Sequence, residues 1–183
     1  MKIARFLSYF SGLAISLAAG WTVLPQALYK EVPQPASFSH AAHTGEKGGM
    51  QCTDCHAFRT DGSFAGVPKL ETCAGCHAEP VGETASEKRF VEEFVKKERE
   101  PQWQIYSRQP DNAWFPHSVH VTRGKLACEG CHGSHGKSAA LPAYRVNRIT
   151  GYSQTVMAGM RMDDCVACHR QRGLSHSCLD CHK

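Results

Sequence analysis

The chain has 183 residues, ten cysteines and a formal net charge of +4. Its length fits one ordinary domain, although apolar residues are sparse after the first thirty positions. The basic charge does not indicate a nucleic-acid-binding protein, because no basic run is interleaved with aromatic residues.

The N-terminal segment is the first predicted element, and it has the pattern of an export signal. Lys2 and Arg5 precede an uncharged stretch over residues 6–24. Small residues at 18–20 are compatible with cleavage by a signal peptidase. The apolar stretch of about 19 to 23 residues is also long enough to span a bilayer. We expect residues 1–30 to form an uncleaved transmembrane helix, with cleavage as the alternative.

After a proline-containing linker, a short unit with two histidines occurs twice in the chain. It reads Phe-Ser-His-Ala-Ala-His at residues 38–43 and Phe-Pro-His-Ser-Val-His at residues 115–120, an offset of 77 positions. Each copy leads into a pair of cysteines. Repetition at a fixed offset indicates an internal duplication of one structural unit.

All ten cysteines belong to five copies of Cys-x-x-Cys-His, the attachment motif of c-type haem. Zinc sites, disulfides and redox dithiols also use Cys-x-x-Cys, but none of them requires a histidine directly afterwards. The sequence therefore predicts five covalently bound haem c groups. The thioether-forming residues are Cys52, Cys55, Cys73, Cys76, Cys128, Cys131, Cys165, Cys168, Cys178 and Cys181, and the proximal iron ligands are His56, His77, His132, His169 and His182.

One amphipathic helix is predicted between the two repeats. Thr84 and Glu87 have the spacing of a capping box. Apolar residues then recur at helical spacing at positions 90, 91, 94 and 95. We expect this stripe to pack on haem edges, with docking of a partner subunit as the alternative. Residues 139–160 show no periodicity and are expected to form a long loop.

Six histidines lie outside the motifs, and a haem iron with a histidine on one face accepts a second ligand on the other. The candidates for this distal ligand are His40, His43, His117, His120, His135 and His176. Sequence proximity assigns His40 to the haem of Cys52 and His117 to that of Cys128. Methionine is an alternative ligand, for which the candidates are Met157, Met160 and Met162.

Five irons with two protein ligands each would have no vacant position for oxygen, nitrite or sulfite, so no catalytic residue is expected. The remaining role is the transfer of single electrons between neighbouring haems. The haems would also supply most of the apolar core, and without them the chain is expected not to fold. Their ten propionates would bring the reduced protein to about −6, so the basic sequence charge is not informative about partners.

The motifs also resemble known families. His40 and His43 before the first motif resemble the class III cytochromes. Residues 115–121, 128–133, 162–170 and 178–182 together are similar to the multihaem cytochrome subunit of the periplasmic quinone reductase (Qrc) complex and of alternative complex III. This resemblance implies a class III-like multihaem cytochrome c fold, made mostly of loops and short α-helices wrapped around the haems.

The resemblance also implies partners: a molybdopterin-enzyme-like subunit, an iron–sulfur subunit, a polytopic quinone-binding membrane subunit and a soluble periplasmic cytochrome c. The chain would then relay electrons between periplasmic cytochromes and menaquinone, anchored in the cytoplasmic membrane with its haems in the periplasm. The alternatives are a free-standing periplasmic carrier that feeds a terminal reductase and a catalytic multihaem enzyme. Because the five motifs use all ten cysteines, a sixth haem could be bound only without thioether bonds.

We expect residues 31–183 to form the pentahaem domain. Within it, residues 38–80 would carry two haems, residues 81–114 would form a helix and connector, and residues 115–183 would carry three haems.

Overall fold

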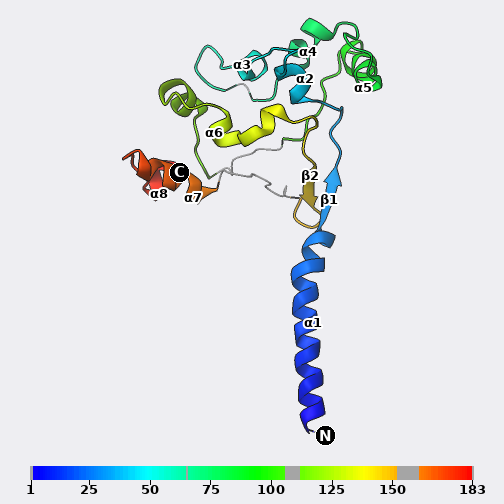
Figure 1. The fold of residues 1–183 in the computed structure, drawn as a ribbon, viewed down its shortest axis with the longest axis vertical. Helices are drawn as coiled ribbons and strands as arrows, with labels where there is room; N and C mark the ends of the chain where they lie inside the picture. Colours follow the sequence, from blue (N-terminus) through cyan, green and yellow to red (C-terminus); the bar gives the residue numbers. More distant parts are fainter. Residues whose placement is uncertain (1, 65, 106–111, 152–160, 183) are drawn as a thin grey trace. The chain divides into compact units, whose positions relative to one another are not determined.

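The structure is a computed structural model, which describes residues 2–64, 66–105, 112–151 and 161–182 (Figure 1). The candidate ligands Met157 and Met160 lie outside the described residues. The chain divides into two compact units. The first comprises residues 1–33 and 143–154, and the second comprises residues 34–142 and 155–183.

The first unit begins with the long helix α1 (Lys2–Leu28). Residues 3–28 are long and apolar enough to cross a membrane, with a mean hydropathy of 1.4. The hydroxyls of Ser8, Ser11 and Thr22 donate to backbone carbonyls one turn earlier, at 2.7–2.9 Å. Because these polar groups are satisfied within the helix, they do not oppose its insertion into lipid.

Strand β1 (Tyr29–Val32) follows α1 directly and pairs antiparallel with β2 (Tyr144–Asn147). Tyr29 lies opposite Asn147, and Val32 lies opposite Tyr144. The prediction of a loop throughout residues 139–160 is therefore wrong at β2. Four residues are too few to show a strand periodicity, and the partner strand lies more than a hundred positions earlier in the chain.

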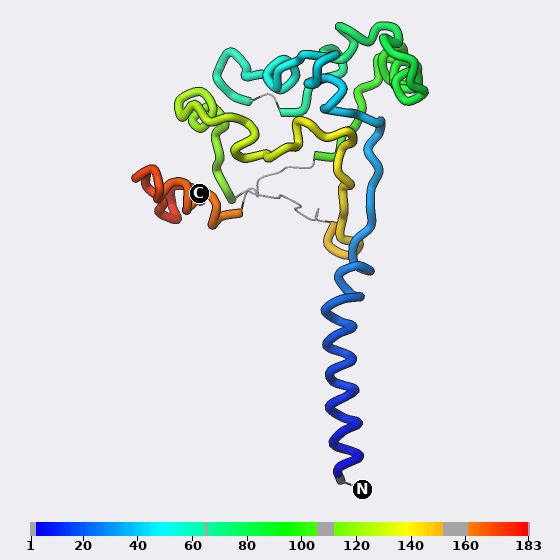
Figure 2. Tube along the Cα trace, viewed as in Figure 1, coloured from blue at the N-terminus to red at the C-terminus, as the bar shows by residue number. Residues whose placement is uncertain are grey.

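The second unit consists of short helices and single helical turns joined by loops (Figure 2). Its first half contains α2 (His40–Thr44), α3 (Cys52–Cys55), α4 (Leu70–His77), α5 (Ala85–Phe90) and the π-helical turn η1 (Val91–Val95). Its second half contains the π-helical turn η2 (Ser118–Arg123), α6 (Glu129–His132), the 3-10 turn η3 (Gly133–Lys137), α7 (Met162–Gln171) and α8 (Cys178–Cys181). Mostly loops and short helices were expected, and this is confirmed.

The apolar core of the described residues is small. Only Leu70, Val91 and Phe94 are buried hydrophobic side chains there, and Val91 alone is fully buried. They lie where η1 packs against α4. Three buried side chains cannot offset the conformational entropy lost by a unit of this length, so a further source of stability is required.

The predicted helix begins at the expected residue, but its capping box is incomplete. The Thr84 hydroxyl accepts a hydrogen bond from the Glu87 backbone N–H at 3.2 Å. The Glu87 carboxylate instead accepts hydrogen bonds from the N–H groups of Val81 and Gly82, at 2.8 and 2.9 Å. A complete capping box would also have the Glu87 carboxylate accept a hydrogen bond from the Thr84 N–H. That bond is absent because the Val81 and Gly82 N–H groups compete for the same carboxylate.

Candidate haem-binding site

Each thiol pair lies on a short helical turn that brings its histidine back over the first cysteine. In α3, the His56 N–H donates to the Cys52 carbonyl at 2.8 Å. The same bond occurs from His132 to Cys128 at 2.9 Å, and from His182 to Cys178 at 2.9 Å. The two cysteines and the histidine therefore face the same volume, as attachment and ligation of one haem require.

Carboxylates cap several of these turns, a feature that the motif analysis missed. Asp54, Asp164 and Asp180 each accept a hydrogen bond from the backbone N–H three positions earlier, at 2.7, 2.9 and 3.1 Å. Glu100 accepts one from the Leu70 N–H at 2.9 Å. An acidic residue at the third helical position is a recognised helix-start pattern, so the three aspartates could have been identified from the sequence.

Four motif histidines each face one histidine of the repeated units. The ring centres of His40 and His56 are 6.4 Å apart, with an angle of 22° between the planes. Those of His117 and His132 are also 6.4 Å apart, at 1°. The structure thus brings together the two pairs expected from sequence proximity.

The second histidine of each repeat faces a more distant motif. His43 lies opposite His77, with ring centres 6.0 Å apart and planes at 60°. His120 lies opposite His169, at 6.1 Å and 33°. The two histidines of one repeat therefore face two different motifs, as their spacing on a helical turn suggests.

Phenylalanine orients the histidines identically in both repeats. Phe38 stacks on His43 at 4.6 Å and meets His40 edge-on at 4.9 Å. Phe115 does the same with His120 and His117, at 4.2 and 4.9 Å. The internal repeat seen in the sequence is thus a repeated three-ring arrangement in space.

Most of these imidazoles use Nδ1 in a hydrogen bond with a backbone carbonyl, which leaves Nε2 available. Nδ1 lies 2.8 Å from the Gly66 carbonyl in His56, 2.7 Å from that of Ser175 in His169, and 3.1 Å from that of Asn112 in His182. His43 and His120 make the same contact with Ser39 and Pro116, at 2.8 and 3.0 Å. Metal-binding histidines usually make this second hydrogen bond, which fixes the tautomer and the ring orientation.

Burial favours the neutral, lone-pair-bearing form of several of these rings. It lowers the pKa of His40 to about 4, with smaller contributions from His135, His56 and His43. Burial is also the main cause of the lowered pKa of His117 and of His132. Neutral imidazole is the form that binds a metal ion.

The remaining candidates have other neighbours. The ring of His135 lies 4.7 Å from that of His40, and His176 Nδ1 lies 3.2 Å from the Leu174 carbonyl. His182 lies against the segment before the second repeat, where the Trp114 N–H donates to the Cys181 carbonyl at 2.7 Å. Met162 is largely exposed.

Thiols of different motifs lie near one another in the second unit. Burial is the main cause of the raised pKa of several motif thiols, and a thiol of another motif raises each of them further. These neighbours are Cys55 for Cys73, Cys52 for Cys128, Cys168 for Cys131, and Cys181 for Cys165. Among the described residues, these neighbours connect the second motif with the first, the first with the third, the third with the fourth, and the fourth with the fifth.

The residues fit a haem iron between each pair of facing rings. A metal ion roughly 2.0–2.1 Å from an imidazole nitrogen on either side holds the two ring centres roughly 6 Å apart. The observed separations are 6.0–6.4 Å, beside thiol pairs on helical turns. This fold and these residues define a multihaem cytochrome c.

Comparison with known proteins agrees with this class. The family model for cytochrome c3 matches residues 42–144. The chain is 37% identical to the menaquinone reductase multihaem cytochrome c subunit of Nitratidesulfovibrio vulgaris (strain Hildenborough), over 96% of this chain and 89% of that protein. The chain thus belongs to the cytochrome c3 family and carries covalently bound c-type haems.

A second relative is more distant. The chain is 29% identical over 137 residues to the cytochrome c-type protein NrfB of Escherichia coli O6:H1 (strain CFT073). That match covers 64% of this chain and 63% of the relative.

Proposed function

We propose that the chain is the electron-transfer subunit of a membrane-bound menaquinone reductase complex and that it binds five haem c groups. The observation that carries this proposal is the set of four facing imidazole pairs at 6.0–6.4 Å. Each pair joins a motif histidine to a histidine of a repeated unit. Similarity to the menaquinone reductase subunit over nearly the whole chain supports the same role.

In this proposal, the ten motif cysteines hold the haems covalently and the motif histidines are the proximal ligands. The distal ligands are His40, His43, His117 and His120, opposite His56, His77, His132 and His169 respectively. His135 and His176 are the candidates for the iron at His182. Each haem supplies a one-electron ferric/ferrous couple, whose potential depends on its axial ligands and surroundings.

The paired imidazoles have two consequences for function. With a nitrogen ligand on either face, the irons at four motifs offer no vacant position to a small substrate, which favours a relay over a catalytic enzyme. The serial order of the motifs gives the relay two ends, at Cys73–His77 and at Cys178–His182. One end would face the electron donor and the other the acceptor.

The N-terminal helix supports attachment to the membrane. We propose that α1 remains uncleaved and spans the cytoplasmic membrane, with residues 31–183 in the periplasm as the pentahaem domain. Thioether attachment of haem takes place on that side. An iron–sulfur subunit, a molybdopterin-enzyme-like subunit and a polytopic quinone-binding subunit are the expected partners, and a soluble periplasmic cytochrome c is the expected redox partner.

Isolation of the tagged chain from native membranes tests this proposal. The expected result is co-purification with membrane subunits in a detergent-solubilised complex that reduces a menaquinone analogue. The haem-to-protein ratio of the same sample should be five. A matched chain in which a cleavable signal peptide replaces residues 1–28 should appear in the soluble periplasmic fraction without these subunits. The proposal would be contradicted if the chain, expressed from its full sequence, were found cleaved, soluble and free of partners.

The similarity to NrfB supports a second candidate, a free-standing periplasmic carrier. The same fractionation distinguishes the two. A carrier would be soluble after removal of α1 by signal peptidase and would reduce a terminal reductase directly, whereas a complex subunit would stay with its membrane partners.

A further inference from the structure

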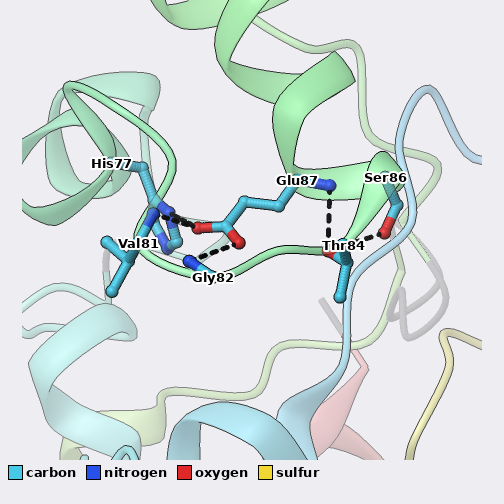
Figure 3. Close-up of polar contacts among 6 residues, drawn as sticks. All are labelled: His77, Val81, Gly82, Thr84, Ser86 and Glu87. Carbon is cyan, nitrogen blue, oxygen red and sulfur yellow. Dashed lines mark hydrogen bonds and ion pairs between the residues drawn. The ribbon is translucent and has the colours of Figure 1, made fainter.

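One motif histidine differs from three others in the group that contacts its Nδ1. His77 Nδ1 lies 2.9 Å from Oε1 of Glu87 (Figure 3). His56, His169 and His182 meet neutral backbone carbonyls at the same atom. His77 is therefore the motif histidine whose Nδ1 lies next to a charged group in the described part of the chain.

The Glu87 carboxylate is held in place by the backbone on its other side. Oε1 accepts a hydrogen bond from the Val81 N–H at 2.8 Å, and Oε2 accepts one from the Gly82 N–H at 2.9 Å. The Thr84 hydroxyl fixes the backbone of Glu87 from the helix N-terminus. The carboxylate thus has its position set before any haem iron changes its charge.

The contact is also shielded from solvent. The side chains of His77 and Glu87 are 22% and 15% exposed. Lower exposure reduces screening by water and salt, so the negative charge acts on the imidazole more strongly than a surface carboxylate would.

We infer that Glu87 is a positioning residue that lowers the reduction potential of the haem iron bound by His77. This inference rests on the proposed function, which assigns His77 as an iron ligand. The couple takes up one electron from its reductant, and the Nδ1 proton stays on His77 throughout. A carboxylate charge 2.9 Å from Nδ1 raises the basicity of Nε2 and stabilises the ferric iron over the ferrous iron.

The proposed location of this haem explains how the contact between Glu87 and His77 would affect electron transfer. In the proposed relay, the Cys73–His77 motif lies at one end, with Cys55 of the first motif as its neighbour. A lowered potential at the end of a relay sets the driving force for exchange with an external partner and favours electron flow away from this haem. Glu87 therefore adjusts the terminal step without contacting the partner.

The test is a potentiometric titration of the isolated holoprotein, followed optically and by EPR. Glu87→Gln keeps the shape of the side chain and removes its charge. Its expected effect is a shift of at least about tenfold in the ferric/ferrous equilibrium of one haem, a rise of about 59 mV for a one-electron couple. The other haems should keep their potentials. The ligand planes of His77 and His43 cross at 60°, the largest of the four angles, which helps to separate this haem by EPR.

Two variants control for structural effects. Glu92→Gln removes a carboxylate on η1 that pairs with Lys96 at 2.8 Å, and it should leave every potential unchanged. Thr84→Ala weakens the start of α5 but keeps the carboxylate, so it should lower stability without the same shift in potential. If Glu87→Gln does not load its haems, Glu87→Asp, whose carboxylate retreats by one methylene, should give a smaller rise at the same haem.

A titration of Glu87→Gln, or of Glu87→Asp in its place, that superimposes on the wild type would overturn the inference. An equal shift in Thr84→Ala would also overturn it, because helix loosening would then be the cause. The haem content of the wild-type sample separates this failure from failure of the proposed function. Five haems with an unchanged titration contradict only the role of Glu87.

Discussion

At the scale of single residues, a phenylalanine in each of the two repeats orients the rings of its two histidines. Phe38 and Phe115 each stack on one histidine and meet the other edge-on. This arrangement directs the two histidines of a repeat to different motifs. A change of either histidine should therefore affect one haem and spare its neighbours.

Replacement of His117 by Met tests this independence. Methionine is a weaker donor to ferric iron than histidine, so we expect one haem potential to rise and the others to stay largely unchanged. A redox titration measures the effect. Met162→Leu, at an exposed side chain, is the control and should change nothing. An unaltered titration of His117→Met would remove His117 from the ligand set.

Gly48 lies close against the backbone of His43. A Cβ at residue 48 would overlap the backbone of His43, including its carbonyl oxygen. Gly48→Ala should displace His43 and cost about 1–3 kcal/mol, the usual range for overpacking. The expected signs are a lower Tm and a new high-spin signal from one haem. Gly136→Ala, where the added Cβ meets no atom within 4 Å, should show neither sign.

At the scale of elements, α5 and η1 form one helical segment whose apolar face packs on α4. Val91 and Phe94 of η1 are buried, as is Leu70 of α4. The stripe predicted from the sequence is therefore a packing face, at least at these two positions. Because α4 carries the second haem motif, the segment supports the same motif that Glu87 contacts.

Truncation of Val91 should loosen this contact. Val91→Ala leaves a cavity at a fully buried site, and we expect a local cost of about 2 kcal/mol. Hydrogen exchange should quicken over residues 85–95 and in α4. Val81→Ala, at a side chain that is 72% exposed, is the control and should leave exchange unchanged. Equal hydrogen-exchange rates in Val91→Ala and Val81→Ala would show that contacts other than those of Val91 stabilise the segment.

At the scale of the whole molecule, the described residues bury few side chains, and the chain offers many candidate haem ligands. The described residues bury three hydrophobic side chains, whereas the proposed haems bring ten thioether bonds and paired iron ligands. We expect covalent and metal-ligand bonds to take the place of the usual apolar core, as in other small metal-dependent folds. The stability of the second unit should therefore depend on haem.

Haem removal tests this dependence. A full-length chain produced in cells that lack the haem-attachment machinery should lack a cooperative thermal transition in its second unit. Helix α1 should stay helical in detergent, because its hydrogen bonds are internal. Far-UV circular dichroism and limited proteolysis provide the measurement, with the holoprotein in the same detergent as control. A sharp transition in the haem-free chain would contradict the prediction.

Much of this protein could be predicted from sequence because its chemistry is local. Cys-x-x-Cys-His is a contiguous motif, and the helix over residues 3–28 needs only its length and composition to be a candidate span. The start of α5 at Thr84 was likewise predicted from neighbouring residues. Each of these features depends on positions within one helical turn or one uninterrupted segment.

What the tertiary structure alone decided involves positions far apart in the chain. The sequence by itself determined the thiol pairs, the repeated histidines, the terminal helix and the family resemblance. Only the folded chain placed His43 opposite His77, paired β2 with β1 and turned Glu87 towards His77 instead of completing its capping box. Such contacts arise from loop closure and competition among nearby partners, and neither leaves a periodic pattern in the sequence.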